Sequence, residues 1–382
     1  MKKTYFYLFA AAFVCVVLFG WRVPASGKNG FQEELATLST VAGLVETSYF
    51  QEVPAERLFR GAVNGLLKTL DPYSLYLDIK AYQEFKGDNE GRFVGTGMEV
   101  SVKGGVLHII APLDGSPAAE AGLRAGDVIT KIEGVTTKDM ALADAVQRLR
   151  GAPGSTVLLT VVRDEEPKPL EFKVVRRALD VKGIREVRTL EDGVAYIRIA
   201  EFQKHTAQDF AEAAKTLGLS NGQGLIIDLR NNPGGLLDAA VKVAENFIPK
   251  GKSIVLTRGR IKKKSRVLVS HNESPLRPGP VAVLVNKGSA SGSEILAGAL
   301  QDYGVARLFG HKTYGKGCVQ TLTPLPDGSA VRITTSLYYT PKGRLIHEIG
   351  IAPDEETVED PKKEEDRALL SALAWIKNEK SR

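Results

Sequence analysis

The sequence predicts an α/β protein with more than one domain. Its 382 residues are too many for one ordinary core, and 43% hydrophobic with 25% charged residues is typical of globular domains. Residues 224–247 and 281–301 each have the pattern of a buried apolar strand, a turn of small residues and a helix. Repeated strand, turn and helix units are typical of an α/β core.

The turn after the apolar run 281–285 carries candidate nucleophiles. Ser289, Ser291 and Ser293 alternate with small residues directly before a helix predicted at 294–301. Small residues let the backbone approach a substrate closely, and the N–H groups at a helix N-terminus favour developing negative charge. Taken alone, the segment also fits a Ser/Gly turn that only caps an ordinary helix.

A second segment, residues 315–320, contains a candidate base. A serine hydroxyl is a poor nucleophile until a neighbouring group takes its proton. A lysine can take it only if desolvation or nearby positive charge lowers the lysine pKa, and lysine shifts readily in this way when buried. Lys316 is the lysine in this segment, so the two segments together indicate a serine–lysine hydrolase.

A series of motifs connects these segments to a known family. SASGSEI, GALQDYG, TYGKGCVQ, LPDGSA, YYTPKGRLI and GIAPD follow one another between residues 289 and 354. In content, order and spacing this series resembles the carboxy-terminal processing peptidases. Ser291 and Lys316 lie 25 residues apart and Gln320 follows four residues later, which is the spacing of that family's serine, lysine and glutamine.

The resemblance selects Ser291 over its two serine neighbours and implies a role for each member of the set. Ser291 is expected to be the nucleophile, Lys316 the general base, and Gln320 a hydrogen-bonding partner of the lysine amine. A side-chain amide suits that role because it can accept from the amine without adding a negative charge. The resemblance also implies a core of the crotonase and Clp-protease type.

The earlier strand, turn and helix unit contains the motif DLRNNPGG at residues 228–235. In the resembled family this motif faces the serine, which implies an oxyanion hole formed by the N–H of Gly234 or Gly235 together with the N–H of Gly292. A plain strand-to-helix connection is the alternative. Residues 71–74, DPYS, resemble a further signature of the family.

The middle of the chain resembles a PDZ domain. Residues 92–100 are similar to the carboxylate-binding loop, whose N–H groups hold a terminal carboxylate while the next strand pairs with the peptide. Residues 115–129 match the most recognisable PDZ segment, and residues 140–149 are expected to form the helix beside the groove. The candidate substrate-binding residues are Gly95, Thr96, Gly97 and Met98. The resemblance implies that the C-termini of unfolded or flexible proteins are the substrates.

Other catalytic sites fit the sequence poorly. Residues 310–316 have the Gly-x4-Gly-Lys spacing of a phosphate-binding loop, but Gly317 replaces the magnesium ligand and a β-branched segment follows instead of a helix. A Gly-x-Ser-x-Gly elbow fails because Ala290 is central in residues 288–292. The five histidines lack metal-ligand spacing, so we expect no metal and no cofactor.

The N-terminus predicts export from the cytoplasm. Lys2 and Lys3 precede an apolar stretch, residues 5–21, that is close to the length of a membrane span. We therefore expect a bacterial protein of the periplasm or cell exterior, anchored in the inner (cytoplasmic) membrane. A cleavable signal that ends around residues 23–25 is the alternative. With only two cysteines, no disulfide framework is predicted.

Two further segments leave partners open. Six basic residues at 258–266 fit either a solvated hairpin tip or a contact with anionic lipid or an acidic partner. No aromatic stacking surface accompanies them, so no nucleic-acid partner is expected. The terminal helix, residues 364–378, fits either subunit contacts in a homo-oligomer or packing within the chain. An adaptor protein is a further possible partner.

We therefore predict a serine endopeptidase with an α/β core, an inserted PDZ domain and N-terminal helices at residues 31–49 and 54–70. The expected regions are a signal segment at 1–30, a helical region at 31–90, the PDZ domain at 91–177, the protease core at 178–358 and a C-terminal helix at 359–382. The alternative is a catalytically silent PDZ scaffold or adaptor protein. The complete set of Ser291, Lys316 and Gln320 favours the enzyme.

Overall fold

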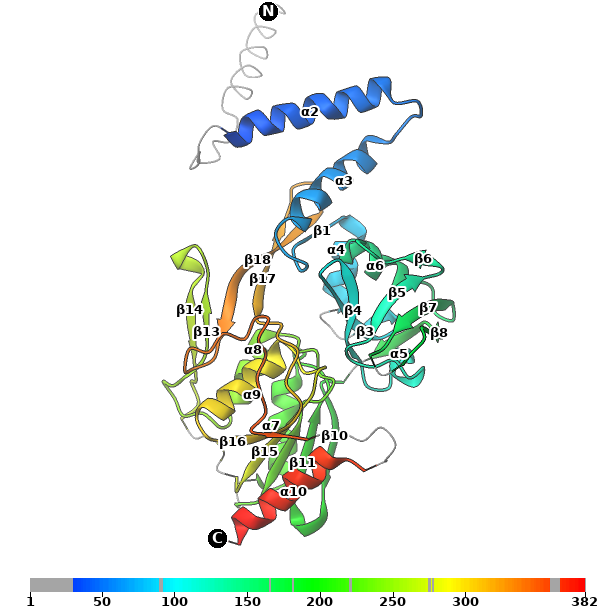
Figure 1. Cartoon of the computed structure of the whole chain (residues 1–382). Helices are drawn as coiled ribbons and strands as arrows, with labels where there is room; N and C mark the ends of the chain where they lie inside the picture. Colours follow the sequence, from blue (N-terminus) through cyan, green and yellow to red (C-terminus); the bar gives the residue numbers. More distant parts are fainter. Residues whose placement is uncertain are drawn as a thin grey trace, which may run out of the picture. The chain divides into compact units, whose positions relative to one another are not determined.

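The computed structural model describes residues 30–88, 92–164, 166–180, 182–219, 222–273, 276, 278–357 and 365–381 (Figure 1). The chain divides into two compact units, residues 1–63 and 64–382. The predicted membrane segment, residues 5–21, lies outside the described residues. Among those that are described, no helix combines the length and hydropathy needed to cross a bilayer.

The two predicted N-terminal helices are present as α2 (Gly30–Ser48) and α3 (Ala55–Lys68). Most large apolar side chains of α2 are exposed, among them Phe31, Leu35 and Leu38. In α3, Leu67 is buried. The DPYS segment follows α3, and Asp71 there accepts hydrogen bonds from the N–H groups of the next turn before strand β1 (Leu75–Leu77) and helix α4 (Ile79–Asp88).

The PDZ-like region is a six-stranded antiparallel sheet with two helices. Its strands are β3 (Met98–Lys103), β4 (Val106–Pro112), β5 (Val128–Ile132), β6 (Val135–Thr136), β7 (Thr156–Val162) and β8 (Leu170–Val175), and its helices are α5 (Pro117–Glu120) and α6 (Leu142–Leu149). Strand β3 lies at one edge of this sheet and pairs with β4. Val100, Ile109 and Leu159 belong to its buried core.

Strands β2 (Arg92–Gly95) and β9 (Arg177–Asp180) pair with each other where the chain enters and leaves this region. The region predicted to be the protease core begins with β10 (Ile184–Thr189), which is antiparallel to its neighbour. Five parallel strands follow in spatial order: β11 (Ala195–Ile199), β12 (Leu225–Asp228), β15 (Val281–Val285), β16 (Ala306–Gly310) and β19 (Glu355–Glu356). This sheet confirms the predicted α/β class.

Helices cover both faces of the parallel sheet because its buried strands are apolar on both sides. One face carries Ile227 and Val283 and packs with α7 (Thr206–Thr216), α8 (Leu237–Glu245) and α9 (Gly292–Asp302). The other face, with Leu284 and Phe309, packs against α10 (Arg367–Lys380), the red helix in Figure 1. The inner face of the terminal helix therefore packs within the chain.

A second sheet carries the segment that follows the candidate base. Its strands are β1, β13 (Ser253–Arg258), β14 (Arg266–Val269), β17 (Cys318–Pro324) and β18 (Ala330–Tyr339), and β17 pairs with β18. The predicted basic cluster lies at the β13–β14 connection, which includes a short 3-10 turn, Lys262–Lys264. The described side chains of the basic cluster are exposed, which both alternatives require.

Candidate active site

The candidate catalytic residues come from loops at one edge of the parallel sheet. Strands β12, β15 and β16 are neighbours and run in the same direction, so the loops at their carboxyl ends meet. DLRNNPGG follows β12, the serine segment follows β15, and the lysine segment follows β16. In open parallel sheets this edge is where ligands bind.

Ser291 occupies a strained position directly before α9. Its backbone has φ 51° and ψ −109°, a conformation that side-chain-bearing residues rarely adopt. Strain of this kind persists only where surrounding structure enforces it, and it is concentrated at functional sites. The nucleophile predicted from the sequence therefore lies at the N-terminus of a helix whose first residues are buried.

Gly234 lies against Ser291. A Cβ atom added to Gly234 would be 2.6 Å from the Ser291 Cβ and 2.7 Å from the Gly292 nitrogen, and the glycine has φ 108°. Only glycine fits such a close approach at a positive φ. The Gly234 N–H donates to Asn232 Oδ1 at 2.9 Å, so its hydrogen is already used in the turn.

The N–H of the next residue, Gly235, is not used within the turn as that of Gly234 is. Within the described part of the chain, the N–H groups of Gly235 and Gly292 have no hydrogen-bond acceptor. Gly235 is fixed by the chain segment around Phe202, because a Cβ there would lie 2.3 Å from the Phe202 carbonyl oxygen. The sequence analysis named Gly234 or Gly235 as one donor of the oxyanion hole. Of these two, Gly235 is the one whose N–H is available to a substrate oxygen.

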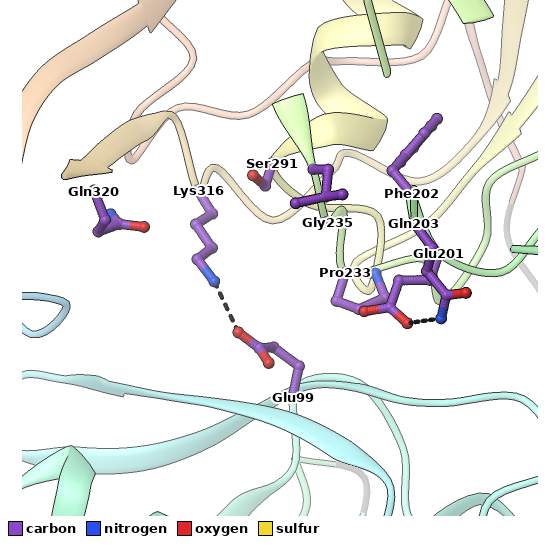
Figure 2. Close-up of a pocket in the computed structure, with 10 residues that line it drawn as sticks. Glu99, Glu201, Phe202, Gln203, Pro233, Gly235, Ser291, Lys316 and Gln320 are labelled. Carbon is purple, nitrogen blue, oxygen red and sulfur yellow. Dashed lines mark hydrogen bonds and ion pairs between the residues drawn. The ribbon is translucent and has the colours of Figure 1, made fainter. Parts of the chain in front are cut away.

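A cavity of about 190 Å³ brings these groups together. Figure 2 shows residues of its wall: Glu99, Glu201, Phe202, Gln203, Pro233, Gly235, Ser291, Lys316 and Gln320. Four of the six predicted catalytic residues therefore line one cavity: Ser291, Lys316, Gln320 and Gly235. The remaining predicted residues, Gly234 and Gly292, lie beside Ser291 in the sequence or in space.

The Lys316 ammonium is paired with a carboxylate. Its Nζ lies 2.8 Å from Glu99 Oε1, and Figure 2 shows the lysine side chain directed toward that glutamate. Burial alone would raise the pKa of Glu99, but the charge and the hydrogen bond of Lys316 hold that pKa below its ordinary value. No hydrogen bond joins Lys316 Nζ to Ser291 or to Gln320 among the described residues.

Glu99 belongs to β3 of the PDZ-like region, and nothing in the sequence analysis singled it out. A register shift between Glu99 and Val100 interrupts the pairing of β3 with β4. Such bulges redirect side chains and are common next to active sites. Val100 is buried in the PDZ-like core, whereas the Glu99 side chain reaches Lys316.

Gln320 has a different partner from the one expected. Its Nε2 donates to Cys318 Sγ at 2.8 Å within β17. Burial raises the pKa of the Cys318 thiol to about 11, so the thiol is neutral at ordinary pH and is not a competing nucleophile. The lysine amine and the Gln320 amide thus line the same cavity while each contacts another residue.

Glu294, in the first turn of α9, is the second residue that the sequence analysis did not identify. Its fully buried carboxylate accepts hydrogen bonds from the backbone of both Ser291 and Lys316. Burial raises the pKa of this carboxyl to about 7, although the hydrogen bonds act in the opposite direction. The pattern Ser-x-x-Glu before a helix signals a capping box, but it does not reveal the contact with the lysine segment.

A buried ionic network holds the DLRNNPGG segment in place. Asp228 Oδ2 accepts hydrogen bonds from the Tyr196 hydroxyl at 2.7 Å, Arg198 Nη1 at 3.0 Å and Arg230 Nη2 at 2.6 Å. Burial would raise the pKa of Asp228, but the two arginines, Arg230 above all, hold it below its ordinary value. Arg198 also pairs with Asp114, so the network reaches into the PDZ-like region.

The predicted carboxylate-binding residues, 95–98, run from the end of β2 to the start of β3, and none of them lines the serine cavity. The carbonyls of Thr96 and Gly97 accept hydrogen bonds from Ala118 and Leu113, which ties the loop to the segment at 115–129. Gly97 has φ 74°, and a Cβ there would meet Ser116 at 2.3 Å. These contacts fix the loop, and its carboxylate binding stays a prediction.

Comparison with known proteins agrees with this organisation. The model of peptidase family S41 matches residues 193–357, a PDZ domain model matches 108–163, and the model of the activating protease CtpB N-terminal domain matches 22–81. A carboxy-terminal-processing protease of Bartonella bacilliformis is 37% identical over 343 residues, covering 89% of this chain and 78% of that protein.

Two more relatives support the assignment. A probable CtpA-like serine protease of Staphylococcus aureus (strain COL) is 38% identical over 335 residues, covering 87% of this chain and 66% of that protein. The solved structure of a photosystem II D1 C-terminal processing protease is 28% identical, with a TM-score of 0.72, and the match covers 86% of this chain and 94% of that one. The chain therefore belongs to peptidase family S41 and is a PDZ-containing serine protease of the carboxy-terminal processing type.

Proposed function

We propose that the chain is an endopeptidase that cleaves through an acyl-enzyme on Ser291, with Lys316 as general base. The observation that carries this proposal is the cavity that holds Ser291, Lys316, Gln320 and Gly235 together although they come from three separate loops and strand β17. The strained backbone of Ser291 and its place at a helix N-terminus add support.

In the proposed reaction, Lys316 first leaves Glu99 and gives its extra proton to solvent water. The neutral amine then takes the proton of the Ser291 hydroxyl while Oγ attacks the carbonyl carbon of the substrate. The carbonyl oxygen becomes an oxyanion, and the N–H groups of Gly235 and Gly292 donate to it. The lysine proton passes to the leaving amine, and the C–N bond breaks to give an ester on Ser291 Oγ. Neutral Lys316 then takes a proton from water while the water oxygen attacks the ester carbonyl carbon. The proton passes to Ser291 Oγ, the ester C–O bond breaks, and the acyl group leaves as a carboxylic acid.

Gln320 is proposed to hold the Lys316 amine after the ion pair with Glu99 opens. An amide oxygen accepts a hydrogen bond from the amine without adding the negative charge that Glu99 carries. A carboxylate at 2.8 Å favours the ammonium form, which has no lone pair for the serine proton. In the resting arrangement Lys316 is therefore paired with Glu99. In the reactive arrangement its amine would instead be hydrogen-bonded to Gln320.

The substrates are proposed to be the C-terminal ends of unfolded or flexible proteins. Strand β3 is an edge strand, and α6 packs near it, so a peptide can add to the sheet beside the loop of residues 95–98. We further propose a location in the bacterial periplasm or at the cell exterior with anchoring by residues 5–21. Assembly as a homo-oligomer and use of an adaptor belong to the same proposal.

The test is proteolysis of an unfolded protein by purified variants. Ser291→Ala, Lys316→Ala and the double variant should each lose activity to a similar extent while remaining folded, because members of one catalytic unit are not additive. Lys287→Ala, which changes an exposed lysine near the serine, is the matched control and should cleave at the wild-type rate. A Ser291→Ala protein with wild-type activity would contradict the proposal, and an inactive wild-type protein would favour a silent PDZ scaffold.

A further inference from the structure

One buried carboxylate connects the nucleophile segment to the base segment. Glu294 Oε2 accepts hydrogen bonds from the Ser291 N–H at 2.9 Å and from the Lys316 N–H at 2.8 Å. Glu294 Oε1 accepts from the Gly315 N–H at 2.7 Å and from the Thr313 hydroxyl at 2.5 Å. A single oxygen atom therefore contacts the backbone of both proposed catalytic residues.

Glu294 is buried, and within the described part of the chain these four hydrogen bonds are the polar contacts of its carboxyl group. The residue has 0% relative exposure. A carboxylate offers about four lone-pair positions, and the four donors occupy all of them. The donors come from two segments more than twenty residues apart in sequence, so the carboxylate connects these two segments. Removing the carboxylate would leave three backbone N–H groups buried without an acceptor.

A second contact extends this arrangement to the C-terminal side of the core. The Thr313 hydroxyl donates to Glu294 and accepts from the Ile351 N–H at 2.7 Å. The backbone of Thr313 also donates to the carbonyl of Ile351 at 3.1 Å. The loop that carries Lys316 is therefore held between Glu294 on one side and Ile351 on the other.

We propose that Glu294 is a positioning residue for proteolysis, whose carboxylate sets the separation between the Ser291 nucleophile and the Lys316 base. It acts on both backbones and does not touch the substrate. The Lys316 side chain moves between partners in the proposed reaction, whereas its backbone stays fixed at Glu294. Misplacement of a catalytic group by about 1 Å can cost about 100-fold in rate, so loss of this contact should act mainly on kcat.

This inference rests on the proposed function, so its test first establishes the nucleophile. A fluorophosphonate should label the wild-type protein at Ser291, as located by peptide mass spectrometry. The labelling rate constant then measures the reactivity of Ser291 without a peptide substrate. Absence of label on Ser291 in the wild type would overturn the proposed function, whereas the variants below decide the role of Glu294.

Two substitutions of Glu294 should lower kcat and the labelling rate by different amounts. Glu294→Ala removes all four bonds, and we expect kcat and the labelling rate to fall about 100-fold with KM changed less than about threefold. Glu294→Gln keeps the shape but puts an amide nitrogen opposite two donors, so we expect a loss of about 10-fold. Glu212→Ala, at an exposed glutamate of α7, is the control and should change neither rate.

Folding is followed by the thermal unfolding midpoint of every variant. If Glu294→Ala does not fold, Glu294→Gln and the pair Thr313→Val and Thr313→Ser decide the matter. Thr313→Ser keeps the hydroxyl donor and should retain activity, whereas Thr313→Val should lose it partly. The proposal is overturned if folded Glu294 variants keep kcat and the labelling rate within about threefold of the wild type. It is equally overturned if both rates fall only in proportion to the folded fraction.

Discussion

The ion pair between Glu99 and Lys316 gives a prediction in which a substitution increases activity. Glu99→Gln keeps the size and one acceptor oxygen of the side chain but removes its negative charge. Because a carboxylate favours the ammonium form of the lysine, the variant should release the neutral amine more readily than the wild type. Glu99 has a pKa below its ordinary value, so it is ionised and the pair is complete at neutral pH.

The size of the effect follows from the exposure of the pair. The Lys316 side chain is 15% exposed and the Glu99 side chain 43% exposed, with 2.8 Å between the charged atoms. Exposed ion pairs contribute about 0.2–1 kcal/mol, and the partial burial of the lysine places this pair at the upper end of that range. A value of about 1 kcal/mol corresponds to about a fivefold rise in the fraction of molecules that can react.

The assay is kcat/KM for an unfolded protein substrate near neutral pH, measured at low and high salt. Glu171→Gln, at an exposed glutamate on β8 of the same PDZ-like region, is the matched control. The Glu99→Gln protein should be about fivefold faster than both the wild type and the control, and added salt should narrow the difference because it screens the pair. A variant that is equal to the wild type or slower would refute the idea that Glu99 restrains the base.

Three further predictions concern other parts of the site. Gly234→Ala should lower kcat by about 100-fold because its Cβ would lie 2.6 Å from the Ser291 Cβ. Gly251 also has a positive φ, 80°, but open space surrounds it. Gly251→Ala is therefore the control that separates steric contact from backbone strain, and it should keep full activity. Asp228→Asn should lower the free energy of unfolding by about 1.5–3 kcal/mol, since it removes a fully buried carboxylate from two arginines that keep Asp114 and Asp366 as their other partners; a change below about 1 kcal/mol in urea unfolding would contradict this. Peptides with a free, apolar C-terminus should be cleaved faster than the same peptides with an amidated end, and removal of residues 91–176 should abolish the difference; equal rates in the full chain would mean that the PDZ-like region does not bind chain ends.

Local sequence patterns predicted most of the fold. The apolar runs at 225–228 and 281–285 became neighbouring parallel strands, and the helices expected at 31–49 and 54–70 appear within a few residues of those bounds. These predictions succeed because periodicity, glycine turns and helix formers act over short stretches of chain. The motif spacing likewise selected Ser291 and Lys316, which line one cavity.

The rest of the site depends on contacts that no local pattern contains. Glu99 lies 217 residues before its partner Lys316, and only the packing of the PDZ-like region places it there. The Ser-x-x-Glu spacing of Ser291 and Glu294 fits a capping box, but the bonds of Glu294 to the lysine segment depend on the order of β15 and β16 in the sheet. The choice between Gly234 and Gly235 depends on one hydrogen bond to Asn232, which spacing cannot show.

The most direct test of the account is to trap the acyl-enzyme. The protein is mixed with an activated ester, quenched within seconds and examined by intact-protein and peptide mass spectrometry. We expect one acyl group on Ser291 in the wild type, none in Ser291→Ala, and a slower or absent adduct in Lys316→Ala, while Lys287→Ala acylates like the wild type. An acyl group on another residue, or equal acylation of the Lys316→Ala and wild-type proteins, would contradict the serine–lysine mechanism.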